Sequence, residues 1–126
     1  MSLKIAIIDD EIHIRSLLEQ TLEDLETDFD VELLVAVNGR EGLEIIQREK
    51  PQLVFCDVMM PEMNGYDVCR AVKVHGLADV KIILLTAKGQ EVDRQQGIDA
   101  GAFDYITKPF DPDELVLRAK EILGLN

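Results

Sequence analysis

The chain has 126 residues, of which 47% are hydrophobic, so it has the length of one ordinary domain and enough apolar side chains for a core. Its 25 acidic and 13 basic residues give a net charge of −12, which argues against direct binding of nucleic acid or of an anionic membrane. No stretch approaches the roughly 18 apolar residues of a membrane span, and no charged leader precedes an apolar stretch. We therefore expect a cytoplasmic single domain over residues 1–126, with its core at 4–123.

Short apolar, β-branched runs alternate with stretches of helical periodicity along the whole chain. The runs predict strands at Lys4–Ile8, Val31–Ala36, Leu53–Cys56, Lys81–Leu85 and Phe103–Ile106. The first helix is indicated by the apolar spacing of Ile14, Leu18, Leu22 and Leu25, and further helices are expected near Arg40–Glu49, Tyr66–Val74, Glu91–Ala100 and Asp113–Leu123. Asp111 and Pro112 suit the N-cap and first position of the last helix, and Gly101 suits the C-cap of the helix before it.

Five strands that alternate with five helices predict an α/β fold. We expect a doubly wound, flavodoxin-like (βα)5 architecture, in which a five-stranded parallel sheet is covered by helices on both faces. In such sheets, ligands bind beyond the carboxyl ends of the strands. Polar side chains stand at these ends in four of the five units, and the fold should therefore gather them at one edge: Asp9, Asp10, Asp57, Thr86 and Lys108.

The combination of these side chains indicates cation binding and phosphoryl transfer, although each residue alone has an ordinary structural explanation. Taken singly, adjacent acids often cap a helix, Thr is common in strands, and a Lys before Pro is usually exposed. Three converging carboxylates repel one another, however, so a protein keeps such an arrangement for a cation or for chemistry. Carboxylates suit Mg²⁺, and Asp57 could then attack a phosphoryl group whose oxygens are bound by Lys108 and Thr86.

Four stretches in chain order carry a resemblance to a known family: Ile7–Glu11, Asp57–Gly65, Leu85–Ala87 and Tyr105–Phe110. The chain resembles the receiver domain of bacterial two-component response regulators over Lys4–Leu123. The resemblance implies that Asp57 accepts a phosphoryl group from a histidine kinase, a phosphotransfer protein or a small donor such as acetyl phosphate. It implies no enzymatic activity beyond the domain's own phosphotransfer and dephosphorylation.

The resemblance also assigns roles around Asp57. It implies that Asp10, Asp57 and the backbone carbonyl of Met59 ligate Mg²⁺, for which Mn²⁺ can substitute, while Asp9 acts largely through water. Thr86, Ala87 and Lys108 would bind the phosphoryl group. Thr86 and Tyr105 would form the switch that remodels the surface of the fourth helix, fifth strand and fifth helix, and the Lys108–Pro109 peptide bond would be cis.

Two positions tune the lifetime of the phosphorylated state in receivers, and here they are Met59 and Lys88. Rapidly dephosphorylating receivers carry an amide and an acid there, which orient the attacking water. Met59 cannot usefully hydrogen-bond water, and Lys88 cannot act as an acceptor. We therefore predict slow loss of the phosphate, as suits transcriptional or developmental control.

Two surfaces are expected to meet partners. The charged residues Arg94, Asp104, Glu114 and Arg118 are similar to those through which winged-helix response regulators form symmetric dimers, with the cross-subunit pairs Arg94–Glu114 and Asp104–Arg118. Phe103 departs from the acid that this subgroup commonly carries. The second surface resembles the face that receivers present to a kinase, and it comprises His13, Ile14, Leu17, Gln20 and Thr21.

Two other classes of protein remain as alternatives. A pseudo-receiver would be an interaction module without phosphorylation, but such proteins usually lack an acid, the Thr or the Lys, all of which are present here. A haloacid-dehalogenase-type phosphatase would also use an Asp nucleophile and Mg²⁺. It would place a second Asp two residues later, where this chain has Met59.

Overall fold

A computed structural model describes residues 3–87 and 94–125 of the chain, except for the side chain of Arg94. In this part of the chain, five parallel strands form one sheet in the order β2-β1-β3-β4-β5. Their bounds are Leu3–Ile8 (β1), Val31–Ala36 (β2), Leu53–Asp57 (β3), Lys81–Ala87 (β4) and Asp104–Lys108 (β5). The winding reverses between β1 and β3, which creates a crevice at the carboxyl ends of these two strands. The predicted doubly wound fold is confirmed.

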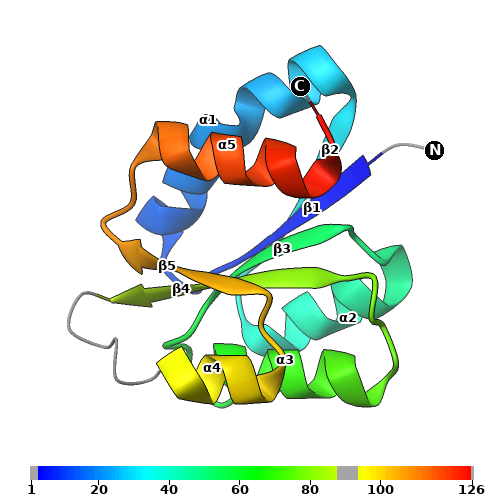
Figure 1. Cartoon of the computed structure of the whole chain (residues 1–126). Coiled ribbons are helices and arrows are strands. Elements are labelled where there is room, and N and C mark those ends of the chain that lie inside the picture. The colour runs from blue at the N-terminus through cyan, green and yellow to red at the C-terminus, as the bar shows by residue number, and fades with distance from the viewer. Residues whose placement is uncertain (1–2, 88–93, 126) are drawn as a thin grey trace.

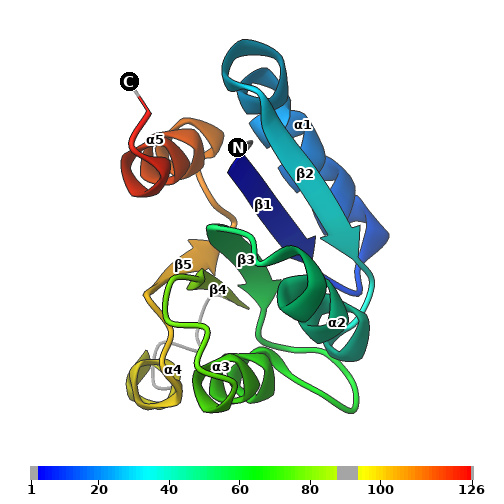
Figure 2. The ribbon, with the colours of Figure 1, turned by 90° about the vertical axis from the view of Figure 1, so that its right-hand side faces the viewer.

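Helices cover both faces of the sheet (Figures 1 and 2). Their bounds are Ile12–Phe29 (α1), Gly39–Glu49 (α2), Gly65–Val74 (α3), Arg94–Ala100 (α4) and Pro112–Leu123 (α5). Figure 1 shows α1 and α5 on one face and α2, α3 and α4 on the other. The first three residues of the predicted helix Glu91–Ala100 lie outside the described residues. None of the described helices is both long enough and apolar enough to cross a membrane.

The core consists of two apolar layers, one on each face of the sheet. Successive strand residues point to opposite faces, so Ile5 and Ile7 belong to the layer under α1 and α5, whereas Ala6 and Ile8 belong to the layer under α2 and α3. Burial on both faces explains why the strands read as continuous apolar runs. The layer under α1 contains Leu18, Leu22 and Leu25, as the helical spacing predicts.

Side-chain hydrogen bonds cap the N-termini of α3 and α5, and a glycine follows the C-terminus of α4. The Asp111 side chain accepts from the backbone N–H of Asp113 at the start of α5, with Pro112 in the first turn, as predicted. Asn64 and Asp67 form a reciprocal capping box at the start of α3. Gly101 follows α4 with φ +102, a conformation that favours glycine.

Three strands end later than predicted, and β1 begins one residue earlier, at Leu3. β3 extends to Asp57, β4 extends to Ala87, and β5 covers Asp104–Lys108 rather than Phe103–Ile106. The predicted limits were wrong because they followed the ends of the apolar runs, whereas parallel pairing continues through the polar residues. Thr86 pairs with Thr107, and Ala87 pairs with Lys108. Three polar side chains of the predicted site therefore lie on the rigid ends of strands.

Candidate functional site

Asp9, in the loop after β1, is held by three hydrogen bonds. The Asp9 N–H donates to the carbonyl of Ala36, and its Oδ1 accepts from the N–H of Glu11 at 2.9 Å. The Arg15 guanidinium donates to the Asp9 carbonyl oxygen at 2.9 Å. Asp9 is fully buried, whereas Asp10 is exposed. The two acids therefore differ in freedom, because Asp9 is fixed and Asp10 faces solvent.

Asp57 ends β3 and is 6% exposed. Behind it, Val58 donates to the Leu85 carbonyl, and the Gly65 N–H donates to the Val58 carbonyl at 3.0 Å. A Cβ atom at Gly65 would lie 2.6 Å from the Asp57 carbonyl oxygen, so only glycine permits this approach of α3. The Asp57 side chain is thus presented by a strand end that is fixed on two sides.

The carboxylates of Asp9, Asp10 and Asp57 converge, with one oxygen of each within 4.8 Å of the others. The Lys108 ammonium lies 3.1 Å from Asp57 Oδ1 and 3.3 Å from Asp9 Oδ2. The cluster of three acids is therefore accompanied by one cation, which pairs with the two buried acids, Asp9 and Asp57. The peptide bond from Lys108 to Pro109 is cis.

This imbalance changes the proton affinity of the site. Burial, followed by the neighbouring Asp9 carboxylate, raises the pKa of Asp57 from 3.8 to about 6, against the opposing effect of Lys108. Burial likewise raises the pKa of Asp9. Burial alone would lower the pKa of Lys108, but the charges of Asp57 and Asp9 raise it. The carboxylates are therefore only partly compensated by the ammonium.

Thr86 and Ala87 stand on β4 beside Asp57. Thr86 is buried, and its Oγ1 has no hydrogen-bond partner among the described residues. A buried hydroxyl without a partner is uncommon, because desolvation of the group is then uncompensated. Ala87 lines a cavity of about 510 Å³ together with Asp10, Glu11, Asp57, Met59 and Lys108. The cavity leaves room for a ligand next to Asp57, and the residue before Ala87 has a hydroxyl whose hydrogen-bonding capacity is unused in the described part of the chain.

The donor set fits a hard divalent cation. Carboxylate oxygens are the ligands that Mg²⁺ and Ca²⁺ prefer, and here three carboxylates converge. A bound cation would also relieve the repulsion between Asp9 and Asp57. The predicted gathering of Asp9, Asp10, Asp57 and Lys108 is therefore present.

The other predicted residues lie at different distances from this centre. Met59 lines the rim of the cavity and is 61% exposed. Tyr105 is half-buried on β5 and packs against the apolar layer under α2, α3 and α4. Lys88 lies outside the described residues. The sequence analysis did not identify Arg15 as a site residue. The helical spacing offers a signal for it, because a residue four positions after Glu11 lies in the first turn of α1, next to the loop that carries Asp9.

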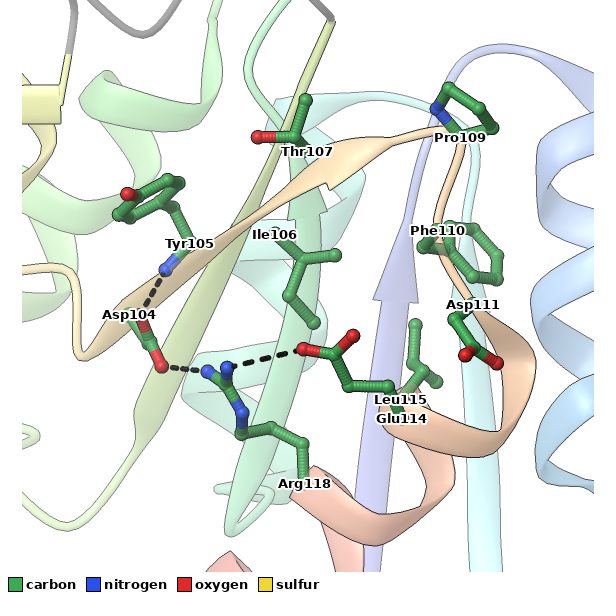
Figure 3. A pocket seen from close by; sticks show the side chains of 10 residues that line it. All are labelled: Asp104, Tyr105, Ile106, Thr107, Pro109, Phe110, Asp111, Glu114, Leu115 and Arg118. Atoms are coloured by element: carbon green, nitrogen blue, oxygen red, sulfur yellow. Dashed lines mark hydrogen bonds and ion pairs between the residues drawn. The ribbon is translucent and has the colours of Figure 1, made fainter.

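Three of the four predicted dimer residues, Asp104, Glu114 and Arg118, lie on β5 and α5 around a groove of about 460 Å³ (Figure 3), and the fourth, Arg94, begins α4. The Arg118 guanidinium bonds to Asp104 and lies 3.7 Å from Glu114 Oε1, both within one chain. The Asp104–Arg118 pair was predicted between two copies, and in the single chain it is already formed internally. The side chain of Arg94 lies outside the described residues, so its pairing with Glu114 stays a prediction.

The predicted docking residues on α1 are not equally accessible. His13, Leu17 and Gln20 are exposed. Ile14 is half-buried and packs against the apolar layer under α1. The Thr21 hydroxyl donates to the Leu17 carbonyl at 2.7 Å, as is common for a Thr within a helix.

Comparisons with known proteins agree with this geometry. The model of the response regulator receiver domain matches residues 5–120. The chain is 45% identical over 120 residues to "Probable transcriptional regulator ycf27" of Porphyra purpurea, covering 95% of this chain and 47% of that protein. It is 42% identical over 123 residues to the alkaline phosphatase synthesis transcriptional regulatory protein PhoP of Bacillus subtilis, covering 98% of this chain and 49% of that protein. The chain thus spans about half the length of these curated relatives.

Solved structures show the same fold. The BeF3-activated DrrB receiver domain is 32% identical, with a TM-score of 0.82 over 98% of this chain and 99% of that one. The chemotaxis protein CheY4 of Vibrio cholerae is 29% identical, with a TM-score of 0.84 over 97% of this chain and 99% of that one. The family match over most of the chain, the shared fold and the acid cluster at the carboxyl edge of the sheet agree. The chain belongs to the response regulator receiver domain family.

Proposed function

We propose that this chain is a phosphorylation-dependent signalling switch in which Asp57 carries the phosphoryl group. The observation that supports it best is the environment of Asp57, which is buried at a strand end between Lys108 and two further carboxylates. Beside it stands the unpartnered hydroxyl of Thr86. A nucleophilic carboxylate next to a cation and an unused donor suits the transfer of a phosphoryl group. The phosphodonor is a histidine kinase, a phosphotransfer protein or a small acyl phosphate.

In the proposed reaction, a carboxylate oxygen of Asp57 forms a bond to phosphorus while the bond from phosphorus to the donor breaks. The Lys108 ammonium, which lies 3.1 Å from Asp57 Oδ1, then pairs with a phosphoryl oxygen in place of the carboxylate. The Thr86 hydroxyl donates to a second oxygen, and Ala87 borders the space that the group enters. Mg²⁺, or Mn²⁺ in its place, supplies positive charge that offsets the repulsion between the carboxylate and the incoming group.

The residues assigned to the cation differ in role. Asp10, Asp57 and the Met59 backbone carbonyl are its proposed direct ligands. Asp9, fixed by Glu11 and Arg15, acts largely through water and keeps the loop in place. The lining of the cavity supports this division, because Asp10, Asp57 and Met59 border the cavity whereas the fully buried Asp9 does not.

The switch itself is proposed to involve Thr86 and Tyr105. When Thr86 turns toward the phosphoryl group, space opens beneath Tyr105, and this aromatic side chain can move inward. The surface formed by α4, β5 and α5 would change as a result. Phosphorylation shifts this equilibrium only to the extent that the phosphoryl group binds one arrangement better than the other. The consequence would be dimerisation through that surface, or the control of an effector.

The lifetime of the phosphorylated state follows from Met59 and Lys88. Met59 places a thioether, a weak hydrogen-bond acceptor, at the rim of the cavity, where water would approach. Substituting Met59→Asn together with Lys88→Glu should therefore speed the loss of phosphate. An unchanged decay rate in the double variant would contradict this assignment.

The central experiment compares phosphate uptake by wild type and Asp57→Asn. Each protein is incubated with acetyl phosphate and Mg²⁺ and then weighed by intact-mass spectrometry. Wild type should gain one phosphoryl group, and Asp57→Asn should gain none. Asp79→Asn, at an exposed position near the opposite ends of the strands, is the matched control and should behave as wild type.

The same samples separate the alternatives. Equal phosphate uptake by wild type and Asp57→Asn would contradict the assignment of Asp57 as the phosphorylated residue. No uptake by wild type under any donor would favour a pseudo-receiver. Continuous hydrolysis of a phosphate ester would favour a phosphatase of the haloacid dehalogenase type.

A further inference from the structure

Met59 brings an exposed sulfur-containing side chain to the mouth of the site. It stands two residues after Asp57, lines the same cavity as Asp10 and Lys108, and is 61% exposed. The next residue, Met60, is 7% exposed and belongs to the apolar layer under α2 and α3. Met63 is half-buried and packs against that layer. Of the described methionines, Met59 is therefore the one that a dissolved oxidant reaches most easily.

We propose that Met59 is an oxidation site and that its sulfoxide shortens the lifetime of the phosphate on Asp57. This inference rests on the proposed function of Asp57. The oxidant is a hydroperoxide such as hydrogen peroxide. With hydrogen peroxide, the Met59 sulfur attacks one oxygen and an S–O bond forms as the O–O bond breaks; the proton of the attacked oxygen passes to the other oxygen, which leaves as water. Sulfur is oxidised by two electrons and the peroxide is reduced by two.

The change matters because of what each form of the side chain can do to water. A thioether sulfur accepts hydrogen bonds only weakly, so it holds no water next to the phosphoryl group. A sulfoxide oxygen is a strongly polar acceptor. The methionine side chain has three rotatable bonds and is mostly in solvent, which lets this oxygen reach over the cavity. A water molecule held there would attack the phosphoryl group of Asp57 more often.

The first test measures where oxidation occurs and needs no phosphorylation. The protein is treated briefly with hydrogen peroxide, digested, and each methionine peptide is quantified by mass spectrometry. Met59 should form sulfoxide about tenfold faster than Met60, because exposure governs access. Equal rates at these two neighbours, or faster oxidation of Met60, would overturn the proposal.

The second test measures the lifetime of the phosphate. Wild type is phosphorylated with acetyl phosphate, the donor is removed, and the loss of the phosphoryl mass is followed with and without prior oxidation. The oxidised protein should lose phosphate at least about threefold faster, and enzymatic reduction of the sulfoxide should restore the slow rate. Met59→Gln, which carries an amide oxygen in a similar place, should decay fast without peroxide.

Met59→Leu is the matched control, since it keeps an apolar side chain and has no sulfur at position 59. Its decay rate should not respond to peroxide. If this variant accelerates as much as wild type, the effect arises elsewhere and the proposal fails. If wild type takes up phosphate but its lifetime is unchanged by Met59 oxidation, only this inference fails. If wild type takes up no phosphate, the proposed function fails and this inference fails with it.

Discussion

Two places in the molecule use the same arrangement, a single cation that faces carboxylates, with different consequences. At the edge of the sheet, Lys108 faces Asp9 and Asp57, and both acids are buried. On the outer face, Arg118 faces Asp104 and Glu114, and all three side chains are in contact with solvent. Figure 3 shows the second arrangement lying across the groove between β5 and α5.

The two clusters differ in how strongly solvent screens their charges. Water screens exposed pairs, so the cluster around Arg118 has little free energy to release when a partner arrives. The buried cluster is poorly screened, and burial, followed by the neighbouring Asp9 carboxylate in the case of Asp57, raises the pKa values of Asp9 and Asp57. A cation that rebalances this charge can therefore change the free energy of the fold around it. The following variants test this contrast.

Removing Lys108 should have the largest effect on stability. Lys108→Ala leaves Asp9 and Asp57 facing each other without their ammonium, which should cost about 2 kcal/mol of unfolding free energy at neutral pH, given that Lys108 is partly solvated. Urea unfolding without divalent cations measures it, and added Mg²⁺ should recover part of the loss. Lys73→Ala, at an exposed position on α3, is the control. A loss no larger than that of the control would show that the buried cluster is better screened than its geometry indicates.

Sequence patterns could predict the buried cluster much better than the exposed one. The continuous apolar runs that alternate with stretches of helical periodicity predict the parallel sheet, and its topology then gathers Asp9, Asp57 and Lys108 at one edge. The hydrogen bond from Arg15 to the Asp9 carbonyl depends on how α1 follows the loop, and residue type does not encode it. The internal partners of Arg118 depend on side-chain rotamers, which is why a pair expected between two copies occurs within one.

Removing the charge of Asp57 should stabilise the domain, with a defined pH dependence. The pKa of Asp57 is raised from 3.8 to about 6 in the folded protein, so the folded state binds the proton more tightly than the unfolded state. The stability of wild type should therefore fall as the pH rises through this range, and the full cost is present above it. Asp57→Asn removes the cost and should be more stable than wild type by about 1–2 kcal/mol at neutral pH without divalent cations.

The check is urea unfolding of both proteins across this pH range, since the advantage of Asp57→Asn should fade as the pH falls toward the ordinary pKa of an aspartate. Asp113→Asn on the exposed start of α5 is the control and should not show this trend. An advantage that stays constant with pH would mean that the burial of Asp57 does not carry the effect.

Arg15 should act on the site through Asp9, as a positioning residue. Arg15→Ala removes the donor to the Asp9 carbonyl and should weaken Mg²⁺ binding about tenfold, since residues that hold metal-site carboxylates in place commonly tune affinity by such a factor or more. Titration calorimetry measures the affinity. Arg15→Lys should recover part of it, and Arg48→Ala, which removes an exposed ion pair with Glu49, should leave it unchanged. Equal Mg²⁺ affinity in Arg15→Ala and wild type would assign Arg15 to the folding of α1 alone.

Breaking the exposed cluster should have the smallest effect on stability. Arg118→Ala removes the bonds to Asp104 and Glu114, yet it should lower the unfolding free energy by less than about 1 kcal/mol, because solvent screens these charges and hydrates the acids left behind. A double-mutant cycle with Asp104→Asn isolates the pair and should give a coupling below that of Lys108 with Asp57 measured in the same way. A larger coupling at Arg118 would reverse the contrast between the two clusters. A small one means that Arg118 can exchange its internal partners for those of another molecule at little cost, as a surface that meets partners requires.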